Sequence, residues 1–319
     1  MRKQIPGIHH ITAIASDPQR NLDFYTSALG LRLVKLTVNF DDPTTYHLYF
    51  GDEQGSPGTL LTFFPWPGAI QGQQGTGQVN AISFAVPGGT LDYWEDRLRQ
   101  RGVTLLERQR RFGEEVLPLL DPDQIRLELV ARAGAKATVP WEGNGVPADY
   151  AIRGFDGVTM GVKDTAPTLD LLTRAMGFAR LDGEGPRIRL RAGSDGDAAF
   201  VDLLPLSGGQ RGRHGPGTVH HVAWRTPGDA EQVVWRQNVA DLGLRVTDVI
   251  DRQYFRSIYF REPGGVLFEI ATDTPGMDWD EPVHALGSRL RLPSWFEPQR
   301  RDIEAALPAL TLPGNGRDG

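Results

Sequence analysis

Apolar residues recur in short runs at similar points along the chain. Four runs begin alike: IHHITAIA from Ile8, VNAISFAV from Val79, FDGVTMGV from Phe155 and VHHVAWRT from Val219. Their content of β-branched and aromatic residues is typical of buried strands. After each run the apolar residues change to helical spacing, so the pattern predicts a strand followed by a helix, four times.

The first helical segment shows why a helix is expected. Asp17 is a suitable N-cap, and Pro18 fits the first helical position, where its missing N–H costs nothing. Leu22 and Tyr25 fall on one face of a helix that runs to Leu29. The three later helices are expected to begin near Thr90, Thr168 and Asp229.

Each predicted helix is followed by a glycine, where a chain that leaves a helix often needs positive φ. These glycines are Gly30, Gly102, Gly177 and Gly243. Further strand-like runs follow, and each unit closes with a strand: LLTFFP, IRLELVA, AFVDLLP or VLFEIAT. The repeat of about 65 to 75 residues therefore predicts an α+β fold of four βαβββ modules.

Pro- and Gly-rich connectors divide the modules at residues 65–78, 131–150 and 206–217. They suggest an N-terminal domain of residues 1–140 with modules one and two. A C-terminal domain of residues 150–275 would hold modules three and four. Residues 276–319 form a tail, and SWFEPQRRDIEAALPAL within it predicts a short helix that packs on the body.

Composition limits the classes of function. The chain has 319 residues, of which 39% are hydrophobic and 23% charged, as expected of a globular protein. A net charge of −6 gives no general electrostatic reason to bind nucleic acid or an anionic membrane. No apolar run approaches the roughly 18 residues of a transmembrane helix. The start MRKQIPG does not resemble a secretory signal.

Cysteine is absent, so disulfides, thiolate catalysis and cysteine-ligated metal sites are excluded. Together with the missing signal segment, this favours a cytoplasmic protein.

Histidine carries the first sign of chemistry. Of the seven histidines, four form the doublets His9–His10 and His220–His221, and both doublets occupy the same place in the repeat. Alignment of the opening strands places His10 over His221. Because strand side chains alternate between faces, only one histidine of each doublet is expected to face a common site. Thr12 continues the face of His10, which selects His10 and His221.

The closing strands supply a carboxylate. Their alignment places Phe63, Glu128, Asp202 and Glu269 in one column. If modules one and four pack together, His10, His221 and Glu269 meet. Two histidines and one carboxylate suit non-haem Fe(II) with open positions, and Mn(II) or Zn(II) fits the same ligands. This arrangement requires module one to pair with module four and module two with module three.

Plainer interpretations exist for each of these residues. A buried strand histidine is usually a hydrogen-bonded core residue, and a buried glutamate needs a partner in any case. Glu128 and Asp202 have no histidine in their modules and are expected to be structural or solvent-facing. His47, His214 and His284 are isolated, and we assign them no role.

The chain resembles the vicinal-oxygen-chelate superfamily. Within it, IHHIT, TVHHVAW, DRQYFRSIYFREPGG, LFEIATD and the tail LGSRLRLPSWFE resemble ring-cleaving dioxygenases that act on hydroquinones. The resemblance implies curved half-barrel sheets, one for each pair of modules, and Fe(II) held by His10, His221 and Glu269. It further implies an enzyme that inserts O2 into a hydroquinone-type ring, with a catecholic ring as the alternative.

The same resemblance implies roles around the metal. Tyr259 and Arg252 are the candidates to move protons and to hold substrate oxygens. Thr12, His9 and His220 are placed to hydrogen-bond nearby. The expected partners are a small aromatic substrate and O2, without nucleic acid or membrane, and a homo-oligomer is compatible with the sequence.

Two other functions use the same fold. A glyoxalase-like metal-dependent isomerase or lyase would need a further ligand or base in the column where the alignment places Phe63. A non-catalytic binding protein of this fold would lack the complete set of three ligands. The sequence therefore favours the dioxygenase over the isomerase, and the isomerase over the binding protein.

Overall fold

The computed structural model describes residues 4–134, 138–193 and 199–313. The strands are β1 (Ile8–Ala15), β2 (Arg32–Asn39), β3 (Asp42–Gly51), β4 (Leu60–Pro65), β5 (Gln78–Pro87), β6 (Thr104–Leu105), β7 (Gln109–Arg111), β8 (Glu114–Leu120), β9 (Arg126–Arg132), β10 (Phe155–Val162), β11 (Ala179–Glu184), β12 (Arg187–Ala192), β13 (Ala199–Pro205), β14 (Thr218–Thr226), β15 (Ile250–Asp251), β16 (Phe255–Arg261) and β17 (Leu267–Pro275). The helices are α1 (Pro18–Asp23), α2 (Leu91–Gln100), α3 (Thr165–Asp170), α4 (Asp229–Asp241) and α5 (Arg300–Ala306).

Short irregular turns complete the secondary structure. Single π-helical turns extend α1 and α3, and 3₁₀ turns lie in the segment after β17. Their bounds are Phe24–Ala28 and Leu171–Ala175 for the π turns, and Met277–Trp279, Val283–Ala285 and Glu297–Gln299 for the 3₁₀ turns.

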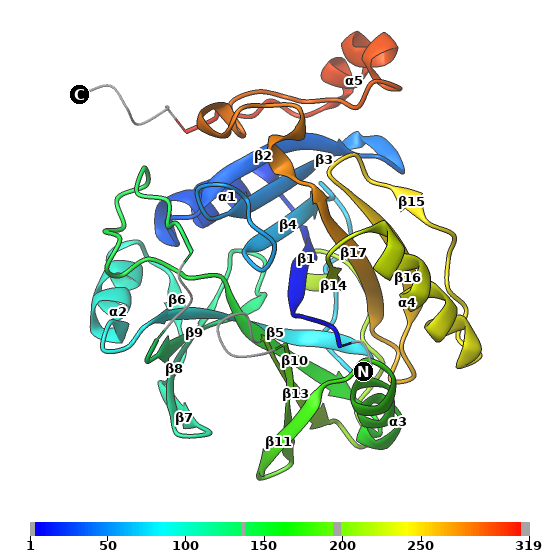
Figure 1. Cartoon of the computed structure of the whole chain (residues 1–319). Coiled ribbons are helices and arrows are strands. Elements are labelled where there is room, and N and C mark those ends of the chain that lie inside the picture. The colour runs from blue at the N-terminus through cyan, green and yellow to red at the C-terminus, as the bar shows by residue number, and fades with distance from the viewer. Residues whose placement is uncertain (1–3, 135–137, 194–198, 314–319) are drawn as a thin grey trace.

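Within the described ranges the strands form two curved sheets. One has the order β15-β16-β17-β14-β1-β4-β3-β2, and the other has the order β11-β12-β13-β10-β5-β9-β8-β6, with β7 paired to β8. Each sheet is curled into a half-barrel (Figure 1). The predicted α+β class and the predicted pairing of the modules, one with four and two with three, are therefore confirmed.

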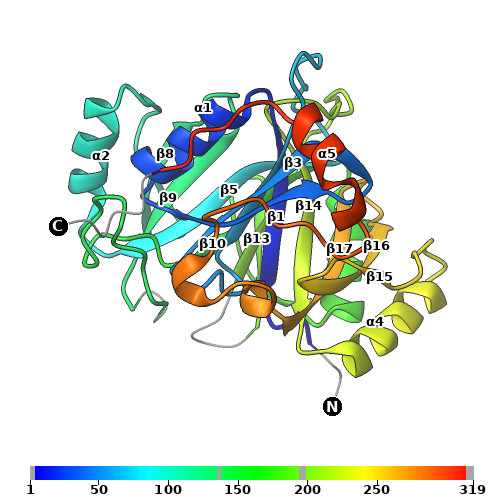
Figure 2. The ribbon, with the colours of Figure 1, turned by 90° about the horizontal axis from the view of Figure 1, so that it is seen from above.

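The central contact of the first sheet is the antiparallel pairing of β1 with β14. Figure 2 shows the two strands side by side, although they come from opposite parts of the chain. The pairing of β5 with β10 is its counterpart in the second sheet. Each sheet thus takes strands from both halves of the sequence. The domain division at residues 1–140 and 150–275 stays a prediction about the sequence.

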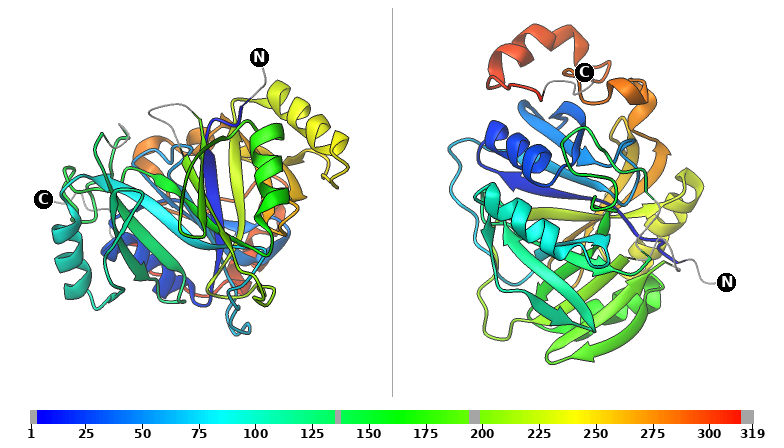
Figure 3. Two further views of the ribbon diagram at one scale, coloured as in Figure 1. Left: turned by 90° about the horizontal axis from the view of Figure 1, so that it is seen from below. Right: turned by 90° about the vertical axis from the view of Figure 1, so that its left-hand side faces the viewer.

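The helices form where the pattern predicts them. Asp17 caps α1 by accepting a hydrogen bond from the backbone N–H of Arg20. The third helix begins at Thr165, slightly before the predicted Thr168, because Asp164 caps it. The four glycines that end the helical segments all have positive φ, between 68° and 78°. In Figure 3 (right), α1 (blue) and α2 (cyan) lie outside the strands that they cover.

The helix-covered side of the first sheet is apolar. Tyr25 from the segment after α1 packs on Phe50 of β3 and Phe63 of β4, with ring centroids 5.3 and 4.6 Å away. All three side chains are fully buried or nearly so. The opposite, concave side carries the polar residues described below. No helix in the described part of the chain is long and apolar enough to cross a membrane.

The predicted C-terminal helix is present as α5, and the segment before it covers part of the first sheet (Figure 1). The anchor is Lys35 of β2, which is fully buried. Its Nζ lies 2.7 Å from Asp280 Oδ1 and 2.6 Å from Glu281 Oε2. Met277 belongs to an apolar cluster with Tyr49 on the concave side. The tail is therefore part of the structure that surrounds the site.

Replacement of Lys35 should be costly. Lys35→Met keeps the volume but leaves the buried Glu281 carboxylate, 1% exposed, without its counter-charge. Removal of one partner of a buried ion pair typically costs about 3 to 5 kcal/mol. We expect a loss of that order in the free energy of unfolding, measured by urea denaturation.

The matched control is Arg174→Met. Arg174 pairs with Asp170 on the surface, where the side chains are 79% and 59% exposed. Such pairs contribute about 0 to 1 kcal/mol. Equal effects of the two substitutions would contradict the anchoring role of Lys35.

Candidate metal centre

Two β-bulges shape the histidine doublets. In the β1–β14 ladder Ile8 pairs with Trp224 and His10 with Ala223, so His9 is an extra residue on β1. Further along the same ladder, Thr12 pairs with His221 and Ala13 with Val219, which makes His220 an extra residue on β14. A bulge breaks the strict alternation of side chains and re-aims them. The two histidines of each doublet therefore need not lie on opposite faces.

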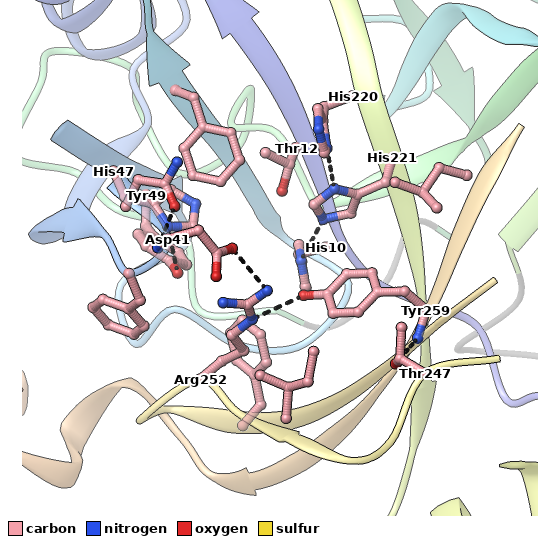
Figure 4. A pocket seen from close by; sticks show the side chains of 16 residues that line it. His10, Thr12, Asp41, His47, Tyr49, His220, His221, Thr247, Arg252 and Tyr259 are labelled. Atoms are coloured by element: carbon pink, nitrogen blue, oxygen red, sulfur yellow. Dashed lines mark hydrogen bonds and ion pairs between the residues drawn. The ribbon is translucent and has the colours of Figure 1, made fainter. Parts of the chain in front are cut away.

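The neighbouring imidazoles contact each other directly. His9 Nδ1 lies 2.9 Å from His10 Nδ1, and His220 Nδ1 lies 2.8 Å from His221 Nδ1. In each doublet this contact engages Nδ1 and leaves Nε2 of His10 or His221 directed elsewhere. Figure 4 shows this contact between His220 and His221. Simple alternation, from which His9 and His220 were expected to point away from the metal, does not hold across the bulges, although neither residue belongs to the group of converging ligand atoms.

The three predicted ligands converge. His10 Nε2 and His221 Nε2 are 3.3 Å apart, and Glu269 Oε2 lies 3.3 Å from the first and 2.9 Å from the second. All three side chains are buried. Metal–ligand bonds of about 2.1 Å place ligand atoms about 3.0 Å apart at right angles and about 3.4 Å apart at tetrahedral angles. The observed separations therefore fit three ligands of one metal ion.

Glu269 has one satisfied and one unsatisfied oxygen. Ser257 Oγ donates a hydrogen bond to Oε1. Among the described residues, Oε2 accepts no hydrogen bond of good geometry although it is buried. Burial would raise the pKa of this carboxyl, but His10 and His221 hold it well below its usual value, so Glu269 is anionic. Glu269 Oε2 is thus a buried anionic oxygen beside two imidazole nitrogens, and a metal ion between them would satisfy all three atoms.

The imidazoles around the cluster are neutral. Burial, and next the nearby His10, lowers the pKa of His9 well below its ordinary value. Burial, and next His221, lowers the pKa of His220 to about 3. The pKa of His221 is also lowered, mainly by burial and against the opposing effect of Glu269. Neutral imidazole is the form that binds metals.

A cavity of about 360 Å³ opens beside the three residues. That volume suits one small aromatic ring with substituents. Its wall is mixed: apolar and aromatic side chains alternate with polar groups (Figure 4). The lining residues that the sequence analysis names are His10, Thr12, His47, His220, His221, Arg252 and Tyr259. His9 does not line the cavity but supports His10 from behind.

Arg252 and Tyr259 act as a pair in the cavity wall. The Nε–H of Arg252 donates to Tyr259 Oη at 3.2 Å, and an Nη of Arg252 lies 3.1 Å from Asp41 Oδ2. Because Tyr259 Oη accepts from the guanidinium, its own O–H is free to donate into the cavity. Burial, and next Glu269, raises the pKa of Tyr259, so the phenol keeps its proton.

One element of the sequence alignment is wrong. The parallel ladders pair Ala223 with Glu269 and Thr12 with Thr62, so Thr62 rather than Phe63 occupies the position that corresponds to Glu269. Phe63 points to the core beneath Tyr25. The error arose because LLTFFP was aligned on its apolar run, which is one residue out of phase. The argument against a fourth carboxylate ligand still holds, since threonine supplies none.

Among the cavity residues to which the sequence assigned no role are His47 and Tyr49 of β3. Tyr49 pairs with Thr62 as Tyr259 pairs with Glu269, so Tyr49 is the counterpart of Tyr259. The signal was present in the sequence, because HLYF at residues 47–50 resembles SIYF at residues 257–260.

The second sheet holds two buried carboxylates at the closing-strand positions that correspond to Glu269 and Thr62 in the first sheet. Glu128 is buried and accepts hydrogen bonds from Arg111 and Ser83. Burial raises the pKa of Glu128, but Arg111 outweighs this effect, so the pKa is lowered from its ordinary value. Asp202 is buried and accepts two hydrogen bonds from Arg189, at 2.7 and 2.9 Å. Of the two roles expected for these acids, the structural one agrees with this geometry and the solvent-facing one does not.

Comparison with known proteins agrees with the geometry. The family model for the Glyoxalase/Bleomycin resistance protein/Dioxygenase superfamily matches residues 7–129 and 154–270. The "Putative ring-cleaving dioxygenase MhqO" of Bacillus subtilis is 48% identical over 308 residues, which cover 96% of this chain and 97% of that protein.

A "Chlorohydroquinone/hydroquinone 1,2-dioxygenase" of Sphingobium indicum is 35% identical over 303 residues, covering 92% of this chain and 94% of that protein. A crystal structure described as a putative dioxygenase from Bacillus subtilis has a TM-score of 0.93 at 47% identity, and covers 98% of this chain and 99% of that one. Relatives of this similarity are thus named as ring-cleaving dioxygenases, one of them for hydroquinones.

Acid should destabilise the metal-free protein through these histidines. The unfolded chain binds a proton at His220 below about pH 6.5, whereas the folded chain does so only near its lowered pKa of about 3. Stability from this group is complete above pH 6.5 and is lost as the pH falls toward 3. We expect His220→Gln to make the pH dependence of the unfolding free energy shallower across this window, measured by denaturant titration. The exposed His284 gives the control, and His284→Gln should keep the wild-type slope. Identical slopes for wild type and His220→Gln would contradict the assignment.

Proposed function

Because this chain belongs to the glyoxalase/bleomycin resistance protein/dioxygenase superfamily, we propose that it is an Fe(II)-dependent ring-cleaving dioxygenase that inserts O2 into a hydroquinone-type ring. The observation that carries the proposal is the convergence of His10, His221 and Glu269 beside a cavity of about 360 Å³. Two histidines and one carboxylate are the ligand set of non-haem iron oxygenases. The relatives named as ring-cleaving dioxygenases support the reaction class.

His10, His221 and Glu269 would hold the metal. Mn(II) would fit the same atoms. Bound Fe(II) would supply the activation of O2 and of a phenolic ring. His9 and His220, in contact with Nδ1 of the two ligands, would fix the orientation of each imidazole.

The protein's own groups then handle the substrate. The aromatic part of the wall, including Phe255 and Phe64, excludes water and packs on the ring. Tyr259 directs its O–H into the cavity, where it can donate to a substrate oxygen. Arg252 orients that phenol and places a fixed positive charge beside any anionic oxygen. Thr12 adds a hydroxyl on the side of His10.

The proposal also covers the substrate, the cellular location and the oligomeric state. A small aromatic molecule and O2 would be the partners, with hydroquinones preferred over catechols. Cytoplasmic location and homo-oligomerisation stay predictions from the sequence. A glyoxalase-like isomerase is less well supported, because the position that corresponds to Glu269 in the first module is Thr62, which offers neither a carboxylate nor a strong base.

Substitution of Glu269 tests the ligand set. Glu269→Gln removes the anionic oxygen, and we expect iron content to fall roughly tenfold or more, since changes even beyond the ligand shell cost 10- to 100-fold in affinity. Glu128→Gln in the corresponding strand of the other sheet is the matched control and should keep its iron. Iron content would be measured by elemental analysis after anaerobic loading. Full iron content in Glu269→Gln would exclude Glu269 as a ligand.

Oxygen consumption tests the reaction. After anaerobic loading with Fe(II), we expect O2 uptake with hydroquinone and substituted hydroquinones, at rates above those with catechols. The physical reason is that the polar groups lie at separate points of the aromatic cavity wall, where they can meet two hydroxyl groups on opposite sides of a ring. Uptake with catechols alone would reassign the substrate class. No uptake, together with turnover of a thiol adduct, would favour the isomerase.

A further inference from the structure

A hydrogen-bonded chain crosses β1, β4 and β3 beside the candidate ligands. Thr12 Oγ1 lies 2.8 Å from Thr62 Oγ1, which lies 2.9 Å from His47 Nε2. On the other side of the ring, His47 Nδ1 is 3.0 Å from Tyr49 Oη. All four side chains are buried. Thr12, His47 and Tyr49 line the cavity (Figure 4), so both ends of the chain reach it.

The position of this chain in the sheet is informative. Thr62 corresponds to Glu269, and Tyr49 corresponds to Tyr259. The candidate ligand set thus has a carboxylate on one side and, at the matching place on the other side, a hydroxyl tied to an imidazole. His47 corresponds in the same way to Ser257, the residue that donates to Glu269. One side of the fold thus orients a candidate ligand, and the other side joins a hydroxyl and an imidazole by hydrogen bonds.

The proton count of the chain allows two states. Burial lowers the pKa of His47 well below its ordinary value, so its ring carries a single N–H. In one state Tyr49 donates to Nδ1, Nε2–H donates to Thr62, Thr62 donates to Thr12, and the O–H of Thr12 is left for the cavity. In the other state every donor is reversed, and the O–H of Tyr49 is left for the cavity. Both states are uncharged and fully hydrogen-bonded.

We propose that Tyr49, His47, Thr62 and Thr12 form a proton relay that carries a proton between two oxygens of the bound aromatic substrate. In one passage Thr12 gives its proton to one oxygen, and each O–H or N–H behind it moves one place along. Tyr49 then takes a proton from the other substrate oxygen, and no charge remains on the protein. This inference rests on the proposed function. It selects rings with two hydroxyl groups, which engage both ends, over monophenols, which engage one.

Tyr49→Phe removes one end of the relay and keeps the ring. We expect kcat with hydroquinone to fall about 100-fold, within the usual range for a positioned proton-transfer group, while KM changes less than threefold and iron content is unchanged. A solvent deuterium series should give a curved dependence of kcat for wild type and a straight line for the variant. The matched control is Tyr46→Phe on the same strand, whose hydroxyl donates to the Pro308 carbonyl outside the cavity. It should keep the wild-type kcat.

A second variant, His47→Gln, and a ¹⁵N NMR spectrum of His47 separate failure of the relay from failure of the proposed function. His47→Gln interrupts the relay in the middle and should match Tyr49→Phe in kcat. If wild type consumes O2 and both variants keep its kcat, the relay is wrong and the proposed function stands. If wild type consumes no O2 with any ring, the proposed function fails, and ¹⁵N NMR of the metal-free chain judges the relay. Exchange between both His47 tautomers supports it, and a single fixed tautomer overturns it.

Discussion

The antiparallel pairing of β1 with β14 is the contact on which the site depends. His10 and His221 are 211 positions apart in the sequence, yet this ladder places them on adjacent strands. Closing so long a loop costs conformational entropy, although the cost grows only slowly with length. It is offset by an extended hydrogen-bonded ladder and by the burial of both strands. Without that pairing, His10 would have no carboxylate within reach.

The bulges turn this pairing into a site. Both occur at the point where a histidine doublet meets the partner strand, and the second sheet has bulges at the same places, with Asp156 and Asn80 as the extra residues. The irregularity is therefore a property of the fold, and the residue placed in it determines the chemistry. In the second sheet Asp156 binds Arg132. In the first sheet the extra residue is an imidazole, which meets the Nδ1 of a candidate ligand.

The repeat and the position of the doublets were enough to predict four modules, their pairing, and the meeting of His10, His221 and Glu269. Three features escaped for physical reasons. Period-two alternation says nothing about where a ladder carries an extra residue, so the roles of His9 and His220 depend on the structure. An apolar run can be aligned one residue out of register without losing its apolar matches. This is why Phe63, and not Thr62, was aligned with Glu269. His47 looked isolated because its partner Thr62 lies on another strand, although its neighbour Tyr49 repeats the place of Tyr259.

Among the described residues one sheet gathers a candidate metal site, and the contacts of the buried carboxylates explain the difference. Buried carboxylates lie at the same position of the closing strand in both, and each must be compensated. In the second sheet, arginines donate to both oxygens of Glu128 and of Asp202, so both carboxylates already have their counter-charge. Glu269 receives a hydrogen bond on one oxygen from Ser257, and its other oxygen faces Nε2 of His10 and Nε2 of His221. Arginine would satisfy that oxygen permanently, whereas imidazoles leave its charge to be balanced by a metal ion. The side chains that face this carboxylate, guanidinium groups in one sheet and imidazoles in the other, therefore separate a structural ion pair from a candidate metal site.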